Sequence, residues 1–121
     1  MYEYTDQVAR YLTPALGDLG FAEGRRGGDN FGDLDPLSTR VFRHENIEVA
    51  VNEDTGQIAL TGHGLDDPNF ERGYLWRANF TLDAPTEVIA GAVNVALAQA
   101  AEKRSMDQLR ASIDRHYARV A

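Results

Sequence analysis

The segment YLWRANFTLDAPTEVIA, residues 74–90, contains a strand pattern followed directly by a helix start. Its first half is apolar at every second position, which places these side chains on one face of a strand: Tyr74, Trp76, Ala78, Phe80 and Leu82. Pro85 and Glu87 then mark the first turn of a helix. The backbone N–H groups of a first turn have no acceptor within the helix, so a proline, which has no N–H, is tolerated there. A glutamate is favoured there because its negative charge lies near the positive end of the helix dipole. We therefore predict a strand that leads through a short turn into a helix.

This helix carries an apolar stripe at helical spacing up to Ala101, formed by Val88, Ile89, Ala92, Val93, Ala96, Leu97 and Ala100. Lys103 and Arg104 are typical of a helix C-terminus, and residues 105–108 (SMDQ) are typical of a capping box that opens another helix. A narrower stripe follows at Met106, Leu109, Ile113, His116 or Tyr117, and Val120. The pattern predicts two C-terminal helices, the second over residues 105–121, with one bent helix over 86–120 as the alternative.

A similar alternation marks three shorter strands upstream, at Thr39–His44, Ile47–Asn52 and Gln57–Gly62. Residues 53–56 (EDTG) join the last two strands as a hairpin loop, since Gly56 supplies the positive φ that such turns need. The short connections predict an antiparallel meander, which the strand at 74–82 completes.

The residues before these strands predict a helix and a loop. Thr5–Leu19 is apolar at helical spacing, and Pro14 within it indicates either a bend or the start of a second short helix. Gly20 followed by Phe21 is typical of a left-handed helix cap. Residues 22–36 are rich in glycine and aspartate, so we predict a flexible loop there.

Together these segments predict a single α+β domain over residues 1–121: a helix, a four-stranded antiparallel meander sheet, and two C-terminal helices packed on one face. The opposite face of the sheet is expected to be solvated, as the polar residues there suggest: Arg43, Glu48, Arg77 and Asn79. Apolar residues are expected among them at Phe42, Ala50 and Leu75.

The composition excludes several kinds of chemistry. Without cysteine, the chain can form neither a disulfide nor a thiolate metal site, and it has no cysteine nucleophile. Its formal charge of -7 disfavours nucleic-acid binding, which draws its affinity from lysine and arginine on phosphates. The first residues lack the basic and apolar blocks of a signal peptide, and no apolar stretch is long enough to span a bilayer. We expect a cytoplasmic protein without a membrane segment.

Two short motifs resemble a known domain family. Residues 76–80 read W-x-A-x-F on the strand, and residues 85–90 read P-x-E followed by two aliphatic residues and an alanine. This combination resembles an actinobacterial, streptomycete-type domain family of unknown function, over residues 37–99. The resemblance implies the fold class given above and an actinobacterial or actinophage source. It implies no functional residue.

No motif in the chain brings together catalytic, cofactor-binding or metal-ligating residues, so we predict none of these sites. We predict instead a non-enzymatic module that binds another protein or a second copy of itself, because an amphipathic helix that follows a complete core needs a surface on which to bury its stripe. The residues expected at that interface are Leu109, Ile113 and Tyr117 on the last helix, or Phe42 and Leu75 on the outer face of the sheet.

Two other functions remain open from the sequence. A small enzyme would use His63 with Asp66 or Asp67, which lie close together in the loop before the last strand. A phage or plasmid protein that contacts nucleic acid would use its few clustered arginines, namely Arg25, Arg26, Arg40 and Arg43.

Overall fold

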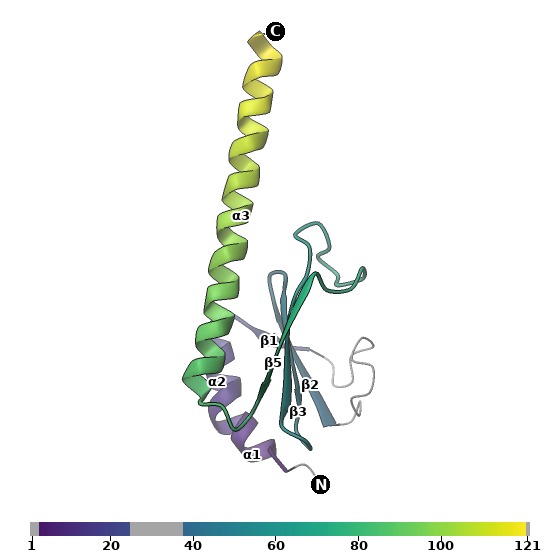
Figure 1. The fold of residues 1–121 in the computed structure, drawn as a ribbon, viewed down its shortest axis with the longest axis vertical. Helices are drawn as coiled ribbons and strands as arrows, with labels where there is room; N and C mark the ends of the chain where they lie inside the picture. Colours follow the sequence, from purple (N-terminus) through teal and green to yellow (C-terminus); the bar gives the residue numbers. More distant parts are fainter. Residues whose placement is uncertain (1–2, 25–37, 121) are drawn as a thin grey trace.

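The strands form one open meander, and the helices cover one of its faces (Figure 1). The computed structural model describes residues 3–24 and 38–120 of the chain. Neighbouring strands are antiparallel, and their order in the sheet follows the chain: β1 (Ala22–Glu23), β2 (Thr39–His44), β3 (Ile47–Asn52), β4 (Gln57–Gly62) and β5 (Trp76–Thr81). The helices are α1 (Thr5–Gln7), η1 (Val8–Leu12), α2 (Thr13–Asp18) and α3 (Thr86–Val120).

The predicted α+β class and antiparallel sheet are confirmed, but the sheet has one strand more than predicted. β2, β3 and β4 have the predicted bounds, and β5 lies within residues 74–82. The additional strand, β1, occupies the first two residues of the predicted loop and pairs Ala22 with Arg43 of β2. Two residues are too few to show the alternation by which a strand is recognised. The rest of that loop, from residue 25, lies outside the described residues.

The β3–β4 hairpin turns at Gly56, as predicted. Gly56 has a φ of +74°, and its N–H donates to the carbonyl oxygen of Asn52 at 2.8 Å. The Asn52 side-chain oxygen accepts the N–H groups of Asp54 and Thr55 at 2.9 and 3.1 Å. A Cβ atom at residue 56 would lie 2.7 Å from the ring of Tyr4, so both backbone conformation and packing favour glycine here.

The N-terminal helical segment runs without a break through α1, η1 and α2. η1 is a π-helical turn, in which the N–H of Thr13 donates to the carbonyl of Val8, five residues back. Pro14 follows directly, near the first position of α2. A proline has no N–H and its ring clashes with the carbonyl four residues earlier, so a wider turn at this place accommodates it.

This helical segment ends in the predicted left-handed cap. Gly20 has a φ of +95°, and the N–H of Phe21 donates to the carbonyl of Leu16 at 3.0 Å. The N–H of Gly20 donates to the carbonyl of Gly17, which completes a Schellman motif. Phe21 is buried, and its ring lies 5.5 Å from that of His44. The cap therefore directs the chain into β1, alongside β2.

The hydrophobic core lies between the helices and the sheet face that points toward them, which we call the inner face. Phe42, Val49 and Leu60 are neighbours across β2, β3 and β4 at its centre. The helices contribute Val8, Leu12, Leu16, Ile89, Val93 and Ala96.

Phe42 was expected on the outer face, and that position is wrong, since its side chain is 1% exposed within the core. The alternation in β2 is ambiguous, because its inner positions include the polar Arg40 and His44, whereas Val41 lies on the outer face and is also buried.

Residues 86–120 form the single helix α3, so the predicted pair of C-terminal helices is wrong. The capping-box pattern at residues 105–108 suggested a new start. No glycine or proline occurs after Gly91, and the intervening residues are largely good helix formers. A capping sequence starts a helix only where the backbone has left helical geometry, and nothing between Ala101 and Ser105 imposes that departure.

α3 packs against the rest of the domain along its first half only. Its buried positions end at Ala100, and an ion pair of 3.2 Å joins Arg104 to Glu45 in the β2–β3 turn. From residue 105 to 118 every side chain is exposed, and the helix projects beyond the sheet (Figure 1). We call residues 105–120 the overhang. Among the described residues, no helix combines the length and apolarity needed to cross a membrane.

The indole ring of Trp76, the first residue of β5, packs over Gly62 of β4. Trp76 is opposite Gly62 in the β4–β5 ladder. A Cβ atom at residue 62 would lie 2.1 Å from Nε1 of Trp76, so the indole occupies the space of the missing side chain. The absence of a side chain at residue 62 thus permits the position of the indole.

We predict that Gly62→Ala destabilises the domain by about 1–3 kcal/mol, the usual cost of forcing an extra methyl group into an occupied space. The indole must move, and Trp76 is the single tryptophan of the chain, so its emission should shift to the red. Urea unfolding followed by tryptophan fluorescence measures both effects.

Gly91→Ala provides the matched control, because a Cβ atom at this exposed helix position meets nothing within 4 Å. It should stabilise the protein by about 0.5–1 kcal/mol, since glycine costs this much in a helix interior. Equal stability of the two variants would show that Trp76 does not depend on Gly62.

Candidate functional site

A row of polar side chains crosses the outer face of the sheet. Arg43, Glu48, Thr61 and Arg77 are paired in register from β2 to β5. Two of the four are buried, Glu48 and Thr61, although this face was predicted to be solvated. The loop between β4 and β5 folds over this part of the sheet and carries the buried Phe70. Beside this loop, the sheet is therefore buried on both faces.

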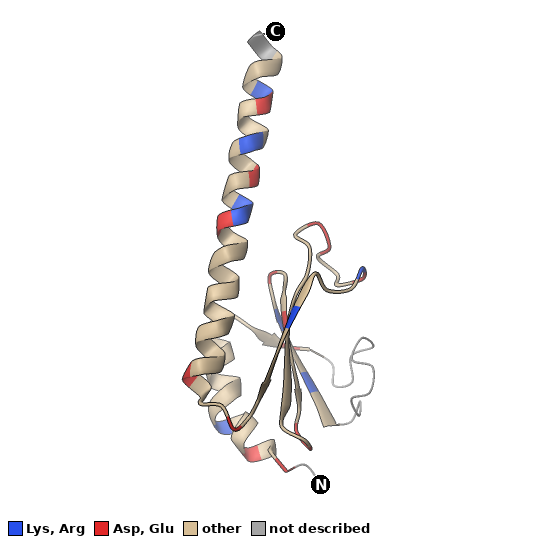
Figure 2. Ribbon diagram, viewed as in Figure 1, with Lys and Arg blue, Asp and Glu red and all other residues tan. Residues whose placement is uncertain are grey.

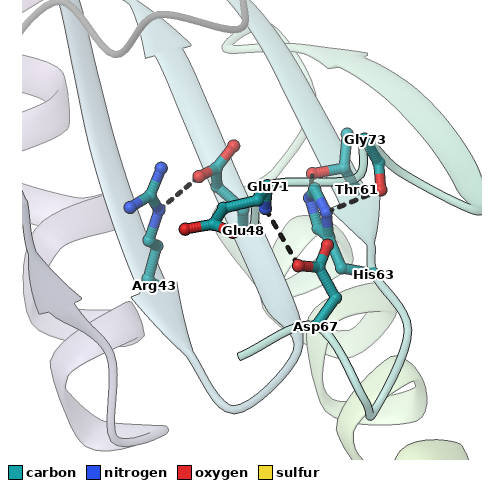
Figure 3. Close-up of polar contacts among 7 residues, drawn as sticks. All are labelled: Arg43, Glu48, Thr61, His63, Asp67, Glu71 and Gly73. Carbon is teal, nitrogen blue, oxygen red and sulfur yellow. Dashed lines mark hydrogen bonds and ion pairs between the residues drawn. The ribbon is translucent and has the colours of Figure 1, made fainter. Parts of the chain in front are cut away.

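The buried Glu48 forms an ion pair with Arg43, its neighbour on β2. The Nε–H of Arg43 donates to a carboxylate oxygen of Glu48 (Figure 3). The same guanidinium lies over the ring of Phe70, 4.7 Å from its centroid. Phe70 has a φ of +57°, an unfavourable conformation for a bulky residue, and its burial offsets this cost.

His63 connects the loop to β4. Its Nδ1 lies 3.1 Å from the carbonyl oxygen of Gly73, which can only accept, so Nδ1 carries a proton (Figure 3). Its Nε2 lies 3.2 Å from the hydroxyl of Thr61, and the ring meets that of Phe70 edge-on at 4.4 Å. Both ring nitrogens are thus engaged within the fold, which explains why a buried histidine is stable here.

Asp67 organises the loop itself. Its carboxylate accepts the N–H group of Glu71 at 2.9 Å (Figure 3) and that of Arg72 at 3.0 Å. These two hydrogen bonds lower the pKa of Asp67, with smaller contributions from the charges of Arg72 and His63. Asp66 points elsewhere, in an exposed ion pair of 2.8 Å with Arg72.

The arrangement differs from the predicted acid–base pair. His63 is oriented by the Gly73 carbonyl, and its other nitrogen is bonded to Thr61 rather than to Asp66 or Asp67. A pocket of about 190 Å³ lies beside them, lined by Glu48, Ala59, Thr61, His63, Gly73, Tyr74 and Arg77. A hydroxyl hydrogen-bonded to a histidine can be activated as a nucleophile. Here the hydroxyl belongs to Thr61, which is buried, so a substrate would not reach it. The contacts best support a role in holding the loop. The spacing of Thr61 and His63 on one strand face could have revealed their contact in the sequence.

The arginines predicted for nucleic-acid binding are engaged where the structure describes them. Arg40 donates from Nε and Nη2 to the two carboxylate oxygens of Glu23, at 2.6 Å each, and lies 3.8 Å from Glu53. The hydrogen bond to Glu23 and the charges of both glutamates raise the pKa of Arg40, against the effect of its burial. Arg43 is paired with Glu48, and Arg25 and Arg26 lie outside the described residues. The Glu23–Arg40 pair could not be predicted from the sequence, because Glu23 lies in a segment that was predicted to be a loop.

Of the residues predicted for partner binding, four are exposed and one, Phe42, is buried in the core. Leu109, Ile113 and Tyr117 are 55%, 45% and 67% exposed on the overhang. Leu75 is 71% exposed just before β5, and Phe42 lies in the core on the opposite face of the sheet. Within residues 3–24 and 38–120, no three histidine, aspartate or glutamate side chains gather as a metal site.

Comparisons with known proteins return no match: no family model, no curated protein and no solved structure is similar to this chain. The resemblance of residues 37–99 to an actinobacterial family therefore stays a prediction.

We predict that the stability conferred by Asp67 is lost in acid. Its pKa is lowered in the folded protein, so its contribution is complete above the unfolded value of about 3.9 and disappears as the pH falls through the folded value. The difference in unfolding free energy between the wild type and Asp67→Asn should be constant from pH 7 to pH 5 and shrink below about pH 4.

Urea unfolding at a series of pH values measures this difference. Asp66→Asn is the matched control, since it removes the neighbouring carboxylate from an exposed ion pair and should change stability little at any pH. A difference for Asp67→Asn that stays constant down to pH 2 would contradict the assignment.

Proposed function

We propose that this protein is a non-enzymatic interaction module that self-associates through the overhang of α3. The observation that carries the proposal is the apolar stripe Met106, Leu109, Ile113 and Tyr117, which is between 45% and 67% exposed. Steps of three and four residues place these side chains on one helix face. Large exposed apolar patches of this kind mark interaction sites on soluble proteins.

The stripe continues along the part of α3 that is packed on the sheet. Val88, Val95, Met106 and Ile113 are separated by seven, eleven and seven residues, close to two, three and two helical turns. Val88 and Val95 are more than half exposed, whereas Ile89 and Val93, on the other side of the helix, are buried in the core. α3 thus has two apolar faces, of which the sheet and the N-terminal helices cover one.

The charge of the overhang favours pairing with a second copy. It carries three arginines and two aspartates, whereas the whole chain has a formal charge of -7. Along its coloured part, charges of both signs alternate (Figure 2). The excess of negative charge therefore resides in the rest of the domain. Two copies repel each other least where their overhangs meet.

We predict that Leu109→Asp combined with Ile113→Asp lowers the native mass of the protein. Each substitution places a carboxylate in the apolar stripe, and burying an unpaired charge in an interface is unfavourable. Size exclusion with in-line light scattering measures the mass of the full chain and of this variant.

The matched control is Gln108→Asp combined with Ala111→Asp, which adds the same residues to the same turns on the other side of the helix. The control should keep the wild-type mass, and circular dichroism should show the same helix content for both variants. A wild-type monomer, or equal masses for the two double variants, would refute self-association through the overhang.

A further inference from the structure

The two edges of the sheet are protected to different degrees. β1 closes one edge with two residues, and β5 forms the other with six. β5 contains no proline, and Arg77 is its single charged residue. Its register with β4 is continuous from Trp76 to Thr81, and the irregularity lies just before it, where the N–H of Leu75 donates to Gly62. Proteins usually guard a long edge strand with prolines, several charges or a bulge within it, since its free N–H and C=O groups can pair with another strand.

One hydrogen bond at the end of β5 shows which of its backbone N–H and C=O groups point away from β4. The N–H of Leu82 donates to the carbonyl of Gly56, in register with the β4–β5 ladder. Antiparallel pairs alternate between bonded and non-bonded, so residues 76, 78 and 80 bond to β4. Arg77 and Asn79 therefore direct their N–H and C=O groups away from the sheet, and no described strand pairs with them.

We propose that β5 pairs with β5 of a second copy, antiparallel, about a two-fold axis that passes through Ala78. Arg77 of one copy then exchanges both backbone hydrogen bonds with Asn79 of the other, and the same pair recurs across the axis. The two sheets join into one of ten strands. This interface is separate from the overhang and does not depend on it.

The side chains of β5 fit this register. Trp76 and Phe80 lie two residues on either side of the axis, so Trp76 of each copy is opposite Phe80 of its partner in a non-hydrogen-bonded pair, while its indole keeps its place over Gly62. Ala78 meets its own copy at the axis, where a small side chain is needed. Arg77 faces the neutral Asn79, which avoids the contact between like charges. A register shifted to Asn79 would replace the aromatic pair with Ala78 against Phe80.

α3 presents an apolar face beside the same edge. Gln99 lines a pocket of about 210 Å³ together with Leu75 and Trp76, so this side of α3 faces the start of β5. Val95 and Val88 lie four and eleven residues before Gln99, on the same side, and both are exposed. A two-fold axis perpendicular to the joined sheet keeps both α3 helices on one face, where these valines approach the partner helix.

The first experiment uses the full chain with Leu109→Asp and Ile113→Asp, in which the overhang cannot pair. We expect this protein to be a dimer by light scattering, smaller than the wild-type assembly. Adding Asn79→Pro should convert it to a monomer, because proline removes an outward N–H that makes no bond to β4. Adding Asn79→Ala instead removes the same side chain and keeps the N–H, so that protein should stay a dimer.

The second experiment detects the register directly. The chain has no cysteine, so Ala78→Cys introduces a single thiol on the proposed axis. Non-hydrogen-bonded partners have Cα atoms about 4.5 Å apart, within the range of a disulfide. Mild oxidation should link two copies through Cys at 78, whereas Asn79→Cys should link poorly, since its two copies lie beyond the roughly 7 Å that a disulfide spans.

The outcomes separate this proposal from self-association through the overhang. A monomeric Leu109→Asp, Ile113→Asp protein, or one that stays dimeric with Asn79→Pro, would overturn β5 pairing and leave the overhang interface intact. If circular dichroism shows that the proline variant is unfolded, the comparison of Ala78→Cys with Asn79→Cys tests the proposal instead. Equal disulfide formation in these two variants, or none in either, would overturn it.

Discussion

The burial of α3 on the inner face of the sheet ends at Ala100 because the strands are short. Six residues of strand extend about 20 Å, whereas the 35 residues of α3 extend about 52 Å. Even an ideal alignment would leave more than half of the helix without a sheet beneath it. The Arg104–Glu45 ion pair is exposed and extends the attachment by about one turn. The overhang is thus a consequence of the lengths of the elements, and its apolar stripe is what requires an explanation.

The outer face of the sheet looks like a polar surface in the sequence and is a satisfied internal network in the structure. Arg43 forms an ion pair with Glu48 and lies over the ring of Phe70. The two ring nitrogens of His63 contact Thr61 and Gly73. Groups that are bonded in this way gain little from a ligand, because any new contact must first replace an existing one. The same reasoning applies to Arg40, which is bonded to Glu23. Interaction is better sought where surface groups are left unused, at the edge of β5 and along α3.

The sequence predicted what depends on local chemistry. Alternation located β2 to β5, Gly20 and Gly56 located a cap and a turn, and Pro85 located the start of α3. It did not locate features that depend on distant partners. β1 lies beside β2, where the buried Phe21 precedes its two residues. Phe42 was predicted on the wrong face because Val41 and Phe42, on opposite faces of β2, are both buried. The false break near Ser105 arose because a capping pattern describes how a helix could start and not whether the preceding helix has stopped.

The positions of the two proposed surfaces determine what they can build together. The β5 edge lies beside the packed half of α3, whereas the overhang extends beyond the sheet, so one copy could use both surfaces at once (Figure 1). Each proposed interface pairs one surface with the same surface of a second copy and would therefore have its own two-fold axis. If the two axes intersect at right angles, four copies would close into a tetramer. Other intersection angles that divide a half-turn evenly would close larger rings, and axes that do not intersect would add copies without end. The direction in which α3 leaves the sheet sets the angle between these axes. The turn from Leu82 to Pro85 is held by the Leu82–Gly56 and Ala84–Thr81 backbone bonds and sets that direction. In the proposed assembly, this turn would therefore select between a closed and an open form.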